Sequence, residues 1–401
     1  MTAQLAVRVP RATQKVTQRW LTEVPADWSV TRLRFICDIA TGSGDTQDSV
    51  PDGEYDFYVR SPIALRSTGF SFDTEAVLTA GDGAVGEVFH HVNGKFHAHQ
   101  RVYVLSNFRD VFPRYFYYYF SSFFRLMAQD GSARTTVDSV RRWMLTDMPF
   151  VLPPLDEQRA IADYLDHETV QIDALVAKQE EFIGLLRERR GAFADAEFQQ
   201  RDGKRSATVR QALVRLERSP LSGSGVVTAY RDGVVTLRAN RRADGYTMSA
   251  AEAGYQGVLP GDIVFHALDG FAGAVGISDS AGQCSPVYHV CRPRYADDAE
   301  YISLLIRYLG TSGFLSTQAP STRQRSVDFR NWGTFARVPL VLPSIDHQKA
   351  FIAEYREQTA QIGALIAKAE EHIALAKERR SALITAAVTG QFDVRTARKA
   401  G

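Results

Sequence analysis

The pattern of hydrophobic residues along the 401 residues changes at two places, and the same short motif stands at both. The stretch "LPPLDEQ", from Leu152, ends one region of mixed sequence, and "LPSIDHQ", from Leu342, ends another. After each motif, apolar residues recur at alternating steps of three and four up to a final "ERR". That spacing predicts a long amphipathic helix with one apolar seam for a partner helix.

The two predicted helices are copies of one another. When residues 152–190 are aligned with residues 342–380 without a gap, 19 of the 39 positions are identical. The prolines before each copy end what precedes it, and Asp156 and Asp346 are candidate helix N-caps or first-turn acids. The chain is therefore predicted to consist of two similar halves, each ending in a long helix.

The predicted seam consists of the apolar residues that follow this spacing. In the first helix they are Ile161, Leu165, Ile172, Leu175, Phe182, Leu186 and Phe193, and in the second Phe351, Tyr355, Ile362, Leu365, Ala369, Ala376 and Leu383. Gln179 and His372 also fall in it, and one polar group there can fix the register. If the helices pair, the economical arrangement is antiparallel, a coiled coil about 60 Å long with one globular region at each end. The alternative is an ordinary amphipathic helix packed on its own domain.

Outside the helices, short β-branched runs alternate with Gly-Asp turns, a pattern typical of strand-rich domains. "VLTAGDGAVGEV" at residues 77–88 resembles "VLPGDIVFHALDGFAGAVGI" at residues 258–277, and an apolar helix is expected after each. We predict an α+β fold with mixed α/β domains at residues 1–151, including an N-terminal extension, and 201–340. Residues 152–200 and 341–401 would form the two antiparallel helices and a C-terminal tail, related by a pseudo-twofold repeat.

Composition and charge narrow the classes of function. The net charge of +1 leaves no overall basic excess, so any surface that attracts phosphates must be local. Residues 201–337 carry 17 Lys and Arg against 12 Asp and Glu. No apolar run approaches the roughly 20 residues needed to cross a bilayer, and the N-terminus has no secretory pattern. Three cysteines without CxxC spacing fit a reducing cytoplasm.

The motifs of common enzymes are missing from the sequence. There is no GxxxxGK[ST] loop and no GxGxxG after a strand. The acid pair in "PDGEYDF" lacks the Glu-x-Lys partner of a nuclease, and the Pro-Pro of "LPPL" lacks the neighbours of an amino-methyltransferase motif. His90, His91, His97 and His99 have no Cys or carboxylate at ligand spacing. The chain is predicted to have no catalytic residue, metal or cofactor of its own.

The doubled motif, the Gly-Asp-rich variable regions and the terminal "SALITAAVTGQFDVR" resemble the specificity subunit of a type I restriction-modification system. The resemblance covers almost the whole chain. It implies that each variable region is a target recognition domain for one half of a bipartite double-stranded DNA target. The helices would set the distance between the halves and dock two methyltransferase subunits, through which a restriction subunit joins. S-adenosylmethionine, ATP and Mg²⁺ would belong to those cytoplasmic partners.

The residues predicted to bind DNA lie in polar loops of both variable regions. They are Arg60, Arg66, Arg134, Arg141 and Arg142 in the first region and Arg231, Arg241, Arg242, Arg323, Gln324, Arg325 and Asn331 in the second. An Arg or Gln side chain can form two hydrogen bonds with the edge of one base, although each of these residues could equally be an ordinary surface residue. A coiled-coil tether whose ends bind proteins remains the alternative, favoured by the near-neutral charge. A self-sufficient enzyme is disfavoured by the missing motifs.

Overall fold

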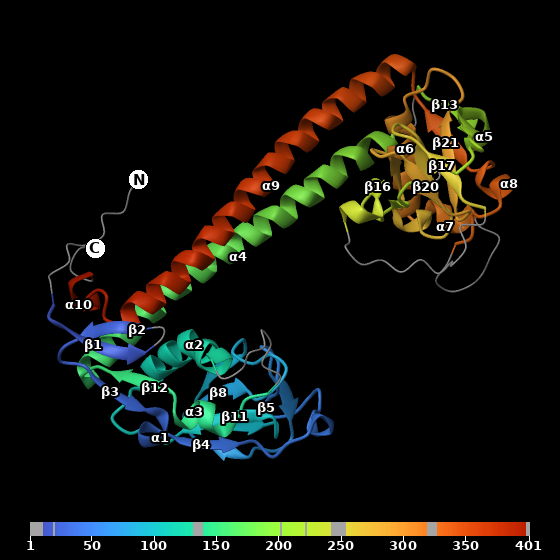
Figure 1. The fold of residues 1–401 in the computed structure, drawn as a ribbon. Coiled ribbons are helices and arrows are strands. Elements are labelled where there is room, and N and C mark those ends of the chain that lie inside the picture. Colours follow the sequence, from blue (N-terminus) through green and yellow to red (C-terminus); the bar gives the residue numbers. More distant parts are fainter. Residues whose placement is uncertain are drawn as a thin grey trace. The chain divides into compact units, whose positions relative to one another are not determined.

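The computed structural model describes residues 11–18, 21–130, 139–200, 203–220, 223–241, 254–318 and 327–397 (Figure 1). The chain divides into two compact units. Unit 1 comprises Met1–Glu180 with Glu370–Gly401, and unit 2 comprises Glu181–Ala369. Each unit thus contains one globular region and part of both long helices, whereas the predicted division ran through the chain in four consecutive segments.

The globular region of unit 1 is built mostly from short strands. They are β1 (Thr13–Gln18), β2 (Leu21–Pro25), β3 (Ser29–Arg32), β4 (Asp38–Thr41), β5 (Tyr55–Tyr58), β6 (Leu65–Ser67), β7 (Phe72–Asp73), β8 (Ala76–Ala80), β9 (Phe89–Val92), β10 (Lys95–Ala98), β11 (Val102–Ser106) and β12 (Pro149–Leu152). The helices are α1 (Leu33–Ile36), the 3-10 turn η1 (Thr46–Asp48), α2 (Pro113–Asp130) and α3 (Arg142–Thr146). One four-stranded sheet has the order β4-β11-β8-β9 and is antiparallel, and a second has the order β6-β5-β10-β7.

The aromatic residues of α2 form the core of unit 1. Tyr115, Phe116, Tyr119 and Phe120 are almost completely buried. The ring of Phe116 stacks on that of Phe150 in β12 with 5.2 Å between centroids. Because packing consumes these faces, the aromatic stripe is core rather than a platform for stacking bases.

Unit 2 repeats this plan with different sequence. Its strands are β13 (Arg205–Thr208), β14 (Leu213–Arg215), β15 (Val227–Ala229), β16 (Val235–Leu237), β17 (Gln256–Val258), β18 (Ile263–His266), β19 (Val275–Ile277), β20 (Gly282–Cys284), β21 (Tyr288–Pro293) and β22 (Pro339–Leu342). The helical elements are α5 (Val209–Ala212), η2 (Arg238–Asn240), η3 (Gly270–Ala272), α6 (Ala299–Thr311), α7 (Phe314–Gln318) and α8 (Trp332–Phe335). The order β14-β21-β18-β19 matches β4-β11-β8-β9 in unit 1, because in both the first strand lies beside the last.

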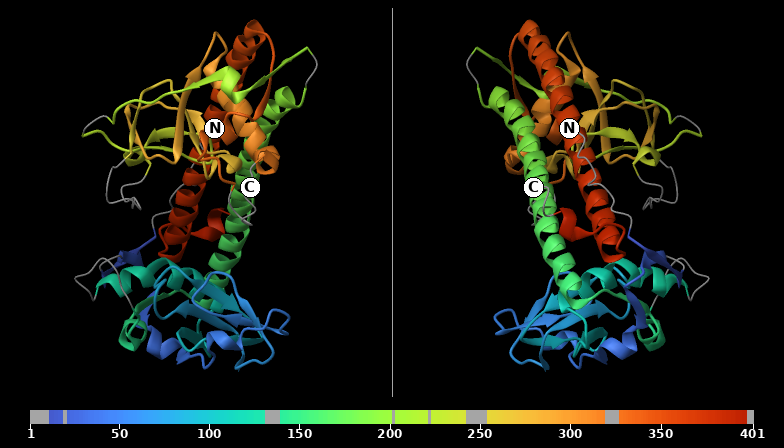
Figure 2. Two further views of the ribbon diagram at one scale, coloured as in Figure 1. Left: turned by 90° about the vertical axis from the view of Figure 1, so that its right-hand side faces the viewer. Right: turned by 90° about the vertical axis from the view of Figure 1, so that its left-hand side faces the viewer.

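The repeated motif opens two long helices, α4 (Leu155–Gln199) and α9 (Ile345–Val388), and the short helix α10 (Val394–Ala397) follows. Within each unit, the α4 and α9 segments lie side by side (Figure 1, Figure 2). In unit 1, Asp173 pairs with Arg380 at 3.0 Å and Glu180 with Lys377 at 3.7 Å. In unit 2, the ring of Phe193 stacks on that of Phe351, and Glu197 lies 3.1 Å from His347. Partner numbers fall along α9 as they rise along α4, so both segments pair antiparallel.

The seam differs from the predicted one at four residues. Ile161, Leu165, Ile172, Leu186, Phe351 and Ile362 are buried and Tyr355 is half-buried. Leu175, Phe182 and Leu365 are instead exposed, by 48%, 41% and 46%. Their places are taken by the next residues, Val176, Ile183 and Ile366, and His372 is likewise exposed beside the half-buried Ile373. Each error falls on adjacent residues of which at least one is apolar, where only unbroken heptad spacing decides which one faces the partner.

The glutamine of each motif copy joins the helix to its globular region. Gln158 is buried, accepts a hydrogen bond from Phe112 N at 2.7 Å, and donates to Pro153 O at 2.8 Å and Asp110 O at 3.1 Å. Gln348 repeats the arrangement in unit 2, where it accepts from the Asp298 backbone and donates to Pro343 O. Each copy of the motif therefore forms the same connection between a long helix and its globular region.

A second contact at each joint has its charges reversed between the units. In unit 1, Arg114 of α2 pairs with Asp166 of α4 at 2.7 Å. In unit 2, Glu300 of α6 pairs with Arg356 of α9 at 2.5 Å. Asp166 and Arg356 occupy equivalent positions of the repeat, 190 residues apart. The joint is therefore kept while its polarity is inverted.

Candidate nucleic-acid interface

In unit 1, three chain segments converge on the turn after β8. Arg60, which follows β5, pairs with Asp82 at 2.8 Å, and Arg101 lies 3.8 Å from the other oxygen of the same carboxylate. The Val140 amide, just before α3, donates to Gly81 O at 2.7 Å. Arg60 is partly exposed, so the ion pair fixes a guanidinium at the surface.

A hollow of about 390 Å³ opens beside this ion pair. It is lined by Thr46, Val59, Arg60, Ser61, Leu65, Gly83, Ala84 and His99. The imidazole Nδ1 of His99 accepts a hydrogen bond from Arg101 N at 3.0 Å, which fixes the ring at the wall. The hollow combines an apolar surface with one cation at its rim.

Unit 2 brings the equivalent segments together. Arg231, which follows β15, pairs with Asp269, which follows β18, at 2.8 Å. The Phe329 amide, just before α8, donates to Ala267 O at 3.0 Å. The same three connections therefore meet in both units, and each meeting point presents an arginine held by an aspartate.

The hollow in unit 2 is larger and richer in aromatic groups. Its volume is about 480 Å³, and it is lined by Thr228, Ala229, Tyr230, Arg231, Asp232, Arg241, His266, Asp269 and Tyr288. The Arg241 guanidinium lies 4.6 Å from the centre of the Tyr230 ring and pairs with Asp232. Burial lowers the pKa of His266, whose Nδ1 accepts from the amides of Leu268 and Asp269, so the ring is neutral near pH 7. Guanidinium groups beside aromatic walls are suited to phosphates and bases.

The other predicted DNA contacts have mixed surroundings. Arg66 donates to Gly53 O and Glu54 O and pairs with Asp56, so it braces its own loop. Arg141 and Arg142 are exposed next to the converging segments. Asn331 caps α8, because its Oδ1 accepts from Gly333 N at 2.7 Å. Arg134, Arg242, Arg323, Gln324 and Arg325 lie outside the residues that the structure describes.

Several residues in or beside the two hollows were not predicted from the sequence. Arg101, Tyr230 and His266 belong to this group, as do the carboxylates of Asp82 and Asp269 that hold the two arginines. The available signal was an Asp-Gly pair at the same point of both regions, Asp82-Gly83 and Asp269-Gly270. Across the described parts of the chain, no cluster of His, Cys, Asp and Glu could hold a metal ion. None of the helices described in the structure is long and apolar enough for a membrane span.

Comparisons with known proteins identify the first variable region. Residues 25–181 match the family model of the type I restriction modification DNA specificity domain. The type I restriction enzyme EcoDI specificity subunit of Escherichia coli is 28% identical over 170 residues, which cover 42% of this chain and 37% of that protein. The match therefore spans little more than a third of that relative.

Solved structures share the fold over a longer stretch. One is a chain solved to explain the complex assembly and conformational transition of the type I R-M system. It has a TM-score of 0.62 at 14% identity, over 92% of this chain and 99% of that one. The HsdS subunit from Thermoanaerobacter tengcongensis has a TM-score of 0.50 at 16% identity, over 92% and 98%. At these identities the likeness shows the fold alone. The domain match places residues 25–181 in the family of type I restriction modification DNA specificity domains, and the chain shares the fold of these two solved structures.

Proposed function

We propose that this chain is the DNA sequence-specificity subunit of a type I restriction-modification complex and that each globular region binds one half of a bipartite target. The observation that carries the proposal is the shared constellation, Arg60–Asp82 in unit 1 and Arg231–Asp269 in unit 2, beside a hollow in each. Equivalent Arg–Asp ion pairs beside differently lined hollows suit two half-sites of different sequence. The held guanidinium groups would contact base edges as well as phosphates, and the linings would complete the reading of bases.

The long helices would hold the two globular regions apart as an antiparallel coiled coil and set the spacing between half-sites. Antiparallel contacts in both units and the doubled glutamine joint support this role. The 45 residues of α4 correspond to about 67 Å at ~1.5 Å per residue. That length suits two surfaces that read DNA between one and two helical turns apart, at ~34 Å per turn.

The same helices would dock two methyltransferase subunits. Leu175 and Leu375 are exposed in unit 1, and Leu185 and Leu365 are exposed in unit 2, each by about half of its surface. Leu175 corresponds to Leu365 in the repeat, and Leu185 to Leu375. Two equivalent apolar faces suit two copies of one partner. A restriction subunit would join through the methyltransferases.

The chemistry would reside in the partner subunits. S-adenosylmethionine, ATP and Mg²⁺ would be bound there, and this chain would contribute recognition without catalysis, in the cytoplasm. A tether that binds proteins at its ends is the second candidate, and the near-neutral net charge favours it. DNA binding distinguishes the two.

The test is enrichment from a random pool of double-stranded DNA by the chain together with a methyltransferase subunit. We expect one bipartite sequence with a fixed gap. Arg60→Ala is expected to relax one half and Arg231→Ala the other. Arg330→Ala, which removes an exposed arginine paired with Asp328, is the control and is expected to leave both halves unchanged. If no bipartite sequence is enriched, the tether is the better description.

A further inference from the structure

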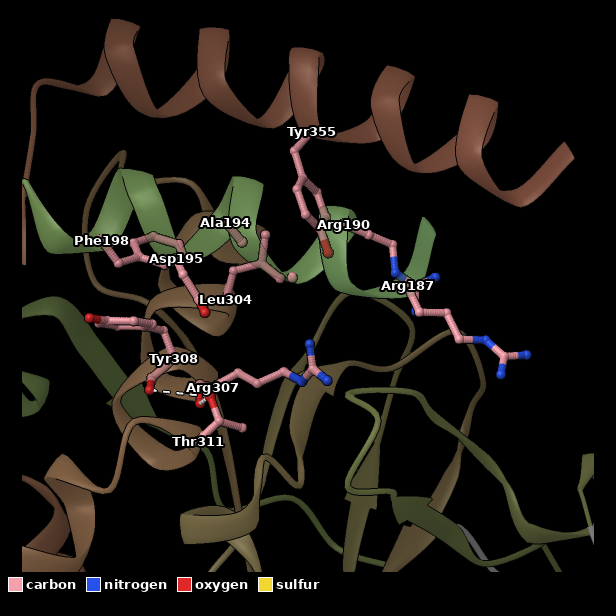
Figure 3. Close-up of a pocket in the computed structure, with 11 residues that line it drawn as sticks. Arg187, Arg190, Ala194, Asp195, Phe198, Leu304, Arg307, Tyr308, Thr311 and Tyr355 are labelled. Carbon is pink, nitrogen blue, oxygen red and sulfur yellow. Dashed lines mark hydrogen bonds between the residues drawn. The ribbon is translucent and has the colours of Figure 1, made fainter. Parts of the chain in front are cut away.

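A second hollow in unit 2 lies where α4, α6 and α9 meet (Figure 3). It consists of a cavity of about 110 Å³ and an adjoining one of about 450 Å³. Both are lined by Arg190, Leu304, Arg307 and Tyr355, so they adjoin, and together they are called the junction cavity. This space shares only Asp232 with the hollow beside Arg231.

One side chain in the wall of this junction cavity has a hydrogen-bond donor without an acceptor. Arg307 is half-buried, and its Nε is buried with no hydrogen-bond partner among the residues that the structure describes. Gly233 packs closely over it, since a Cβ there would lie 2.9 Å from that nitrogen. Arg190 reaches the same space from α4 with no ion pair to any described residue, and Tyr355 enters from α9 (Figure 3). A buried donor without a partner is costly, which favours an acceptor from outside the chain.

Two of the three carboxylates near the junction cavity form their ion pairs with other arginines, although the charge of Arg307 also acts on Asp232. Asp232 pairs with Arg241, and Glu300 pairs with Arg356. Asp195 remains, and burial raises its pKa although Arg307 acts in the opposite direction. The charge balance of the cavity of about 110 Å³ is therefore positive, because the guanidinium groups of Arg187, Arg190 and Arg307 line it against the single carboxylate of Asp195, whose ionised form burial disfavours.

The internal repeat explains why Arg190 is available. Its equivalent in unit 1 is Arg380, which pairs with Asp173 at 3.0 Å. The position equivalent to Asp173 is Gly363, 190 residues later, and it has no side chain. The carboxylate that holds the arginine in unit 1 is thus absent at the matching place in unit 2, and the arginine lines the junction cavity instead.

We propose that the junction cavity binds a phosphate group between Arg190 and Arg307, with the Tyr355 hydroxyl as a further donor. Guanidinium groups match phosphate oxygens in geometry and charge. A volume of about 110 Å³ holds several water-sized groups, which is enough for one tetrahedral oxyanion. The phosphate comes either from the DNA backbone between the half-sites, which rests on the proposed function, or from free phosphate or a phosphate monoester.

The sharpest test restores the missing carboxylate. Gly363→Asp gives Arg190 the partner that Arg380 has, whereas Gly363→Ala replaces the same glycine without adding a charge, and each variant is compared with its own phosphate-free melting temperature. Nothing lies within 4 Å of a Cβ at this exposed position, so both variants are expected to fold. The full chain is titrated with inorganic phosphate and followed by the ³¹P line width and the melting temperature. General stabilisation by phosphate acts on both variants alike.

We expect wild type and Gly363→Ala to broaden the ³¹P line and to gain roughly 2–4 °C near ten times Kd. Gly363→Asp and Arg307→Gln are expected to lose both effects, and Arg189→Gln, an exposed neighbour on α4, to keep them. An identical response in the Ala and Asp variants, or none in wild type, overturns the proposal. No DNA is present, so the outcome is independent of whether the chain reads a bipartite target.

A DNA arm identifies the source of the phosphate. If the ligand is a backbone phosphate, Gly363→Asp reduces the slope of log affinity against log salt by about 0.9 and leaves both half-sites unchanged. If the slope is unchanged while inorganic phosphate binding is lost, the ligand is a free phosphate or phosphate monoester.

Discussion

Replacement of Gln158 by Leu tests whether the repeated motif acts as a joint. Leu has a similar size and no polar atoms, so the change removes the three hydrogen bonds to Phe112 N, Pro153 O and Asp110 O. Gln158 is almost fully buried, so these partners lose their hydrogen bonds in a site with little access to water. A buried polar group left without a partner costs ~1–3 kcal/mol. We therefore expect a loss of about 3 kcal/mol in the unfolding free energy of unit 1.

The assay is urea unfolding of unit 1, combined with hydrogen exchange at the Phe112 amide. Because ~1.4 kcal/mol corresponds to a factor of ten, protection at that amide is expected to fall roughly 100-fold. Gln171→Leu is the matched control, since Gln171 is also identical in both repeat copies but is exposed. Its effect is expected to stay within about 0.5 kcal/mol. If the two variants are equally destabilised, or if Gln158→Leu is neutral, the joint does not depend on this side chain.

Three further outcomes follow from the helices and from one buried carboxylate. Deletion of seven residues from α4 and the equivalent seven from α9 shortens the helix pair by ~10 Å. The gap between the enriched half-sites should therefore shrink by about three base pairs, while the sequences of both half-sites stay the same. An altered half-site would contradict the model of two separate DNA-reading surfaces. Leu185→Glu combined with Leu365→Glu should reduce the bound methyltransferase from two copies to one, as measured by sedimentation. Ala367→Glu is the control. Two retained copies would refute the apolar docking face. Although burial opposes it, hydrogen bonds from Tyr301, Lys204 and His347 hold the pKa of Glu197 below its ordinary 4.5. The unfolding free energy of unit 2 should therefore fall as the pH drops below about 4.5, and Glu197→Gln should flatten this dependence in melting curves; an unchanged profile would exclude Glu197 as the cause.

The features that were predicted well from the sequence are those that depend on residue patterns over short stretches of the chain. The repeat, the two long helices with Asp156 and Asp346 in their first turns, and the family follow from motifs within a few dozen residues. The exposed Leu175 beside the half-buried Val176 shows the limit of that reasoning, because both residues are apolar and a shift of one position selects between them.

The surfaces around the two hollows depended on distant pairings that no local pattern encodes. Arg60 meets Asp82 and Arg231 meets Asp269 only after strands of two different sheets have come together in each unit. Asn331 shows a structural role that its position in a polar loop did not suggest, because its side chain caps α8. Residue type therefore indicated which side chains could bind DNA, and tertiary structure decided which of them stand at a concave surface.

The inverted ion pairs at the two joints limit how parts of this chain can be interchanged. If the globular region of unit 2 were grafted onto the start of α4, Glu300 would face Asp166, and the reverse graft would set Arg114 against Arg356. Like charges at that distance repel, so a chimera cut at the repeated motif would carry a mismatch in each half. A cut placed within the helices, beyond Asp166 and Arg356, would move each region together with its own counter-charge. Exchange of modules between such proteins should therefore succeed more often when the breakpoint lies a few turns inside the helix.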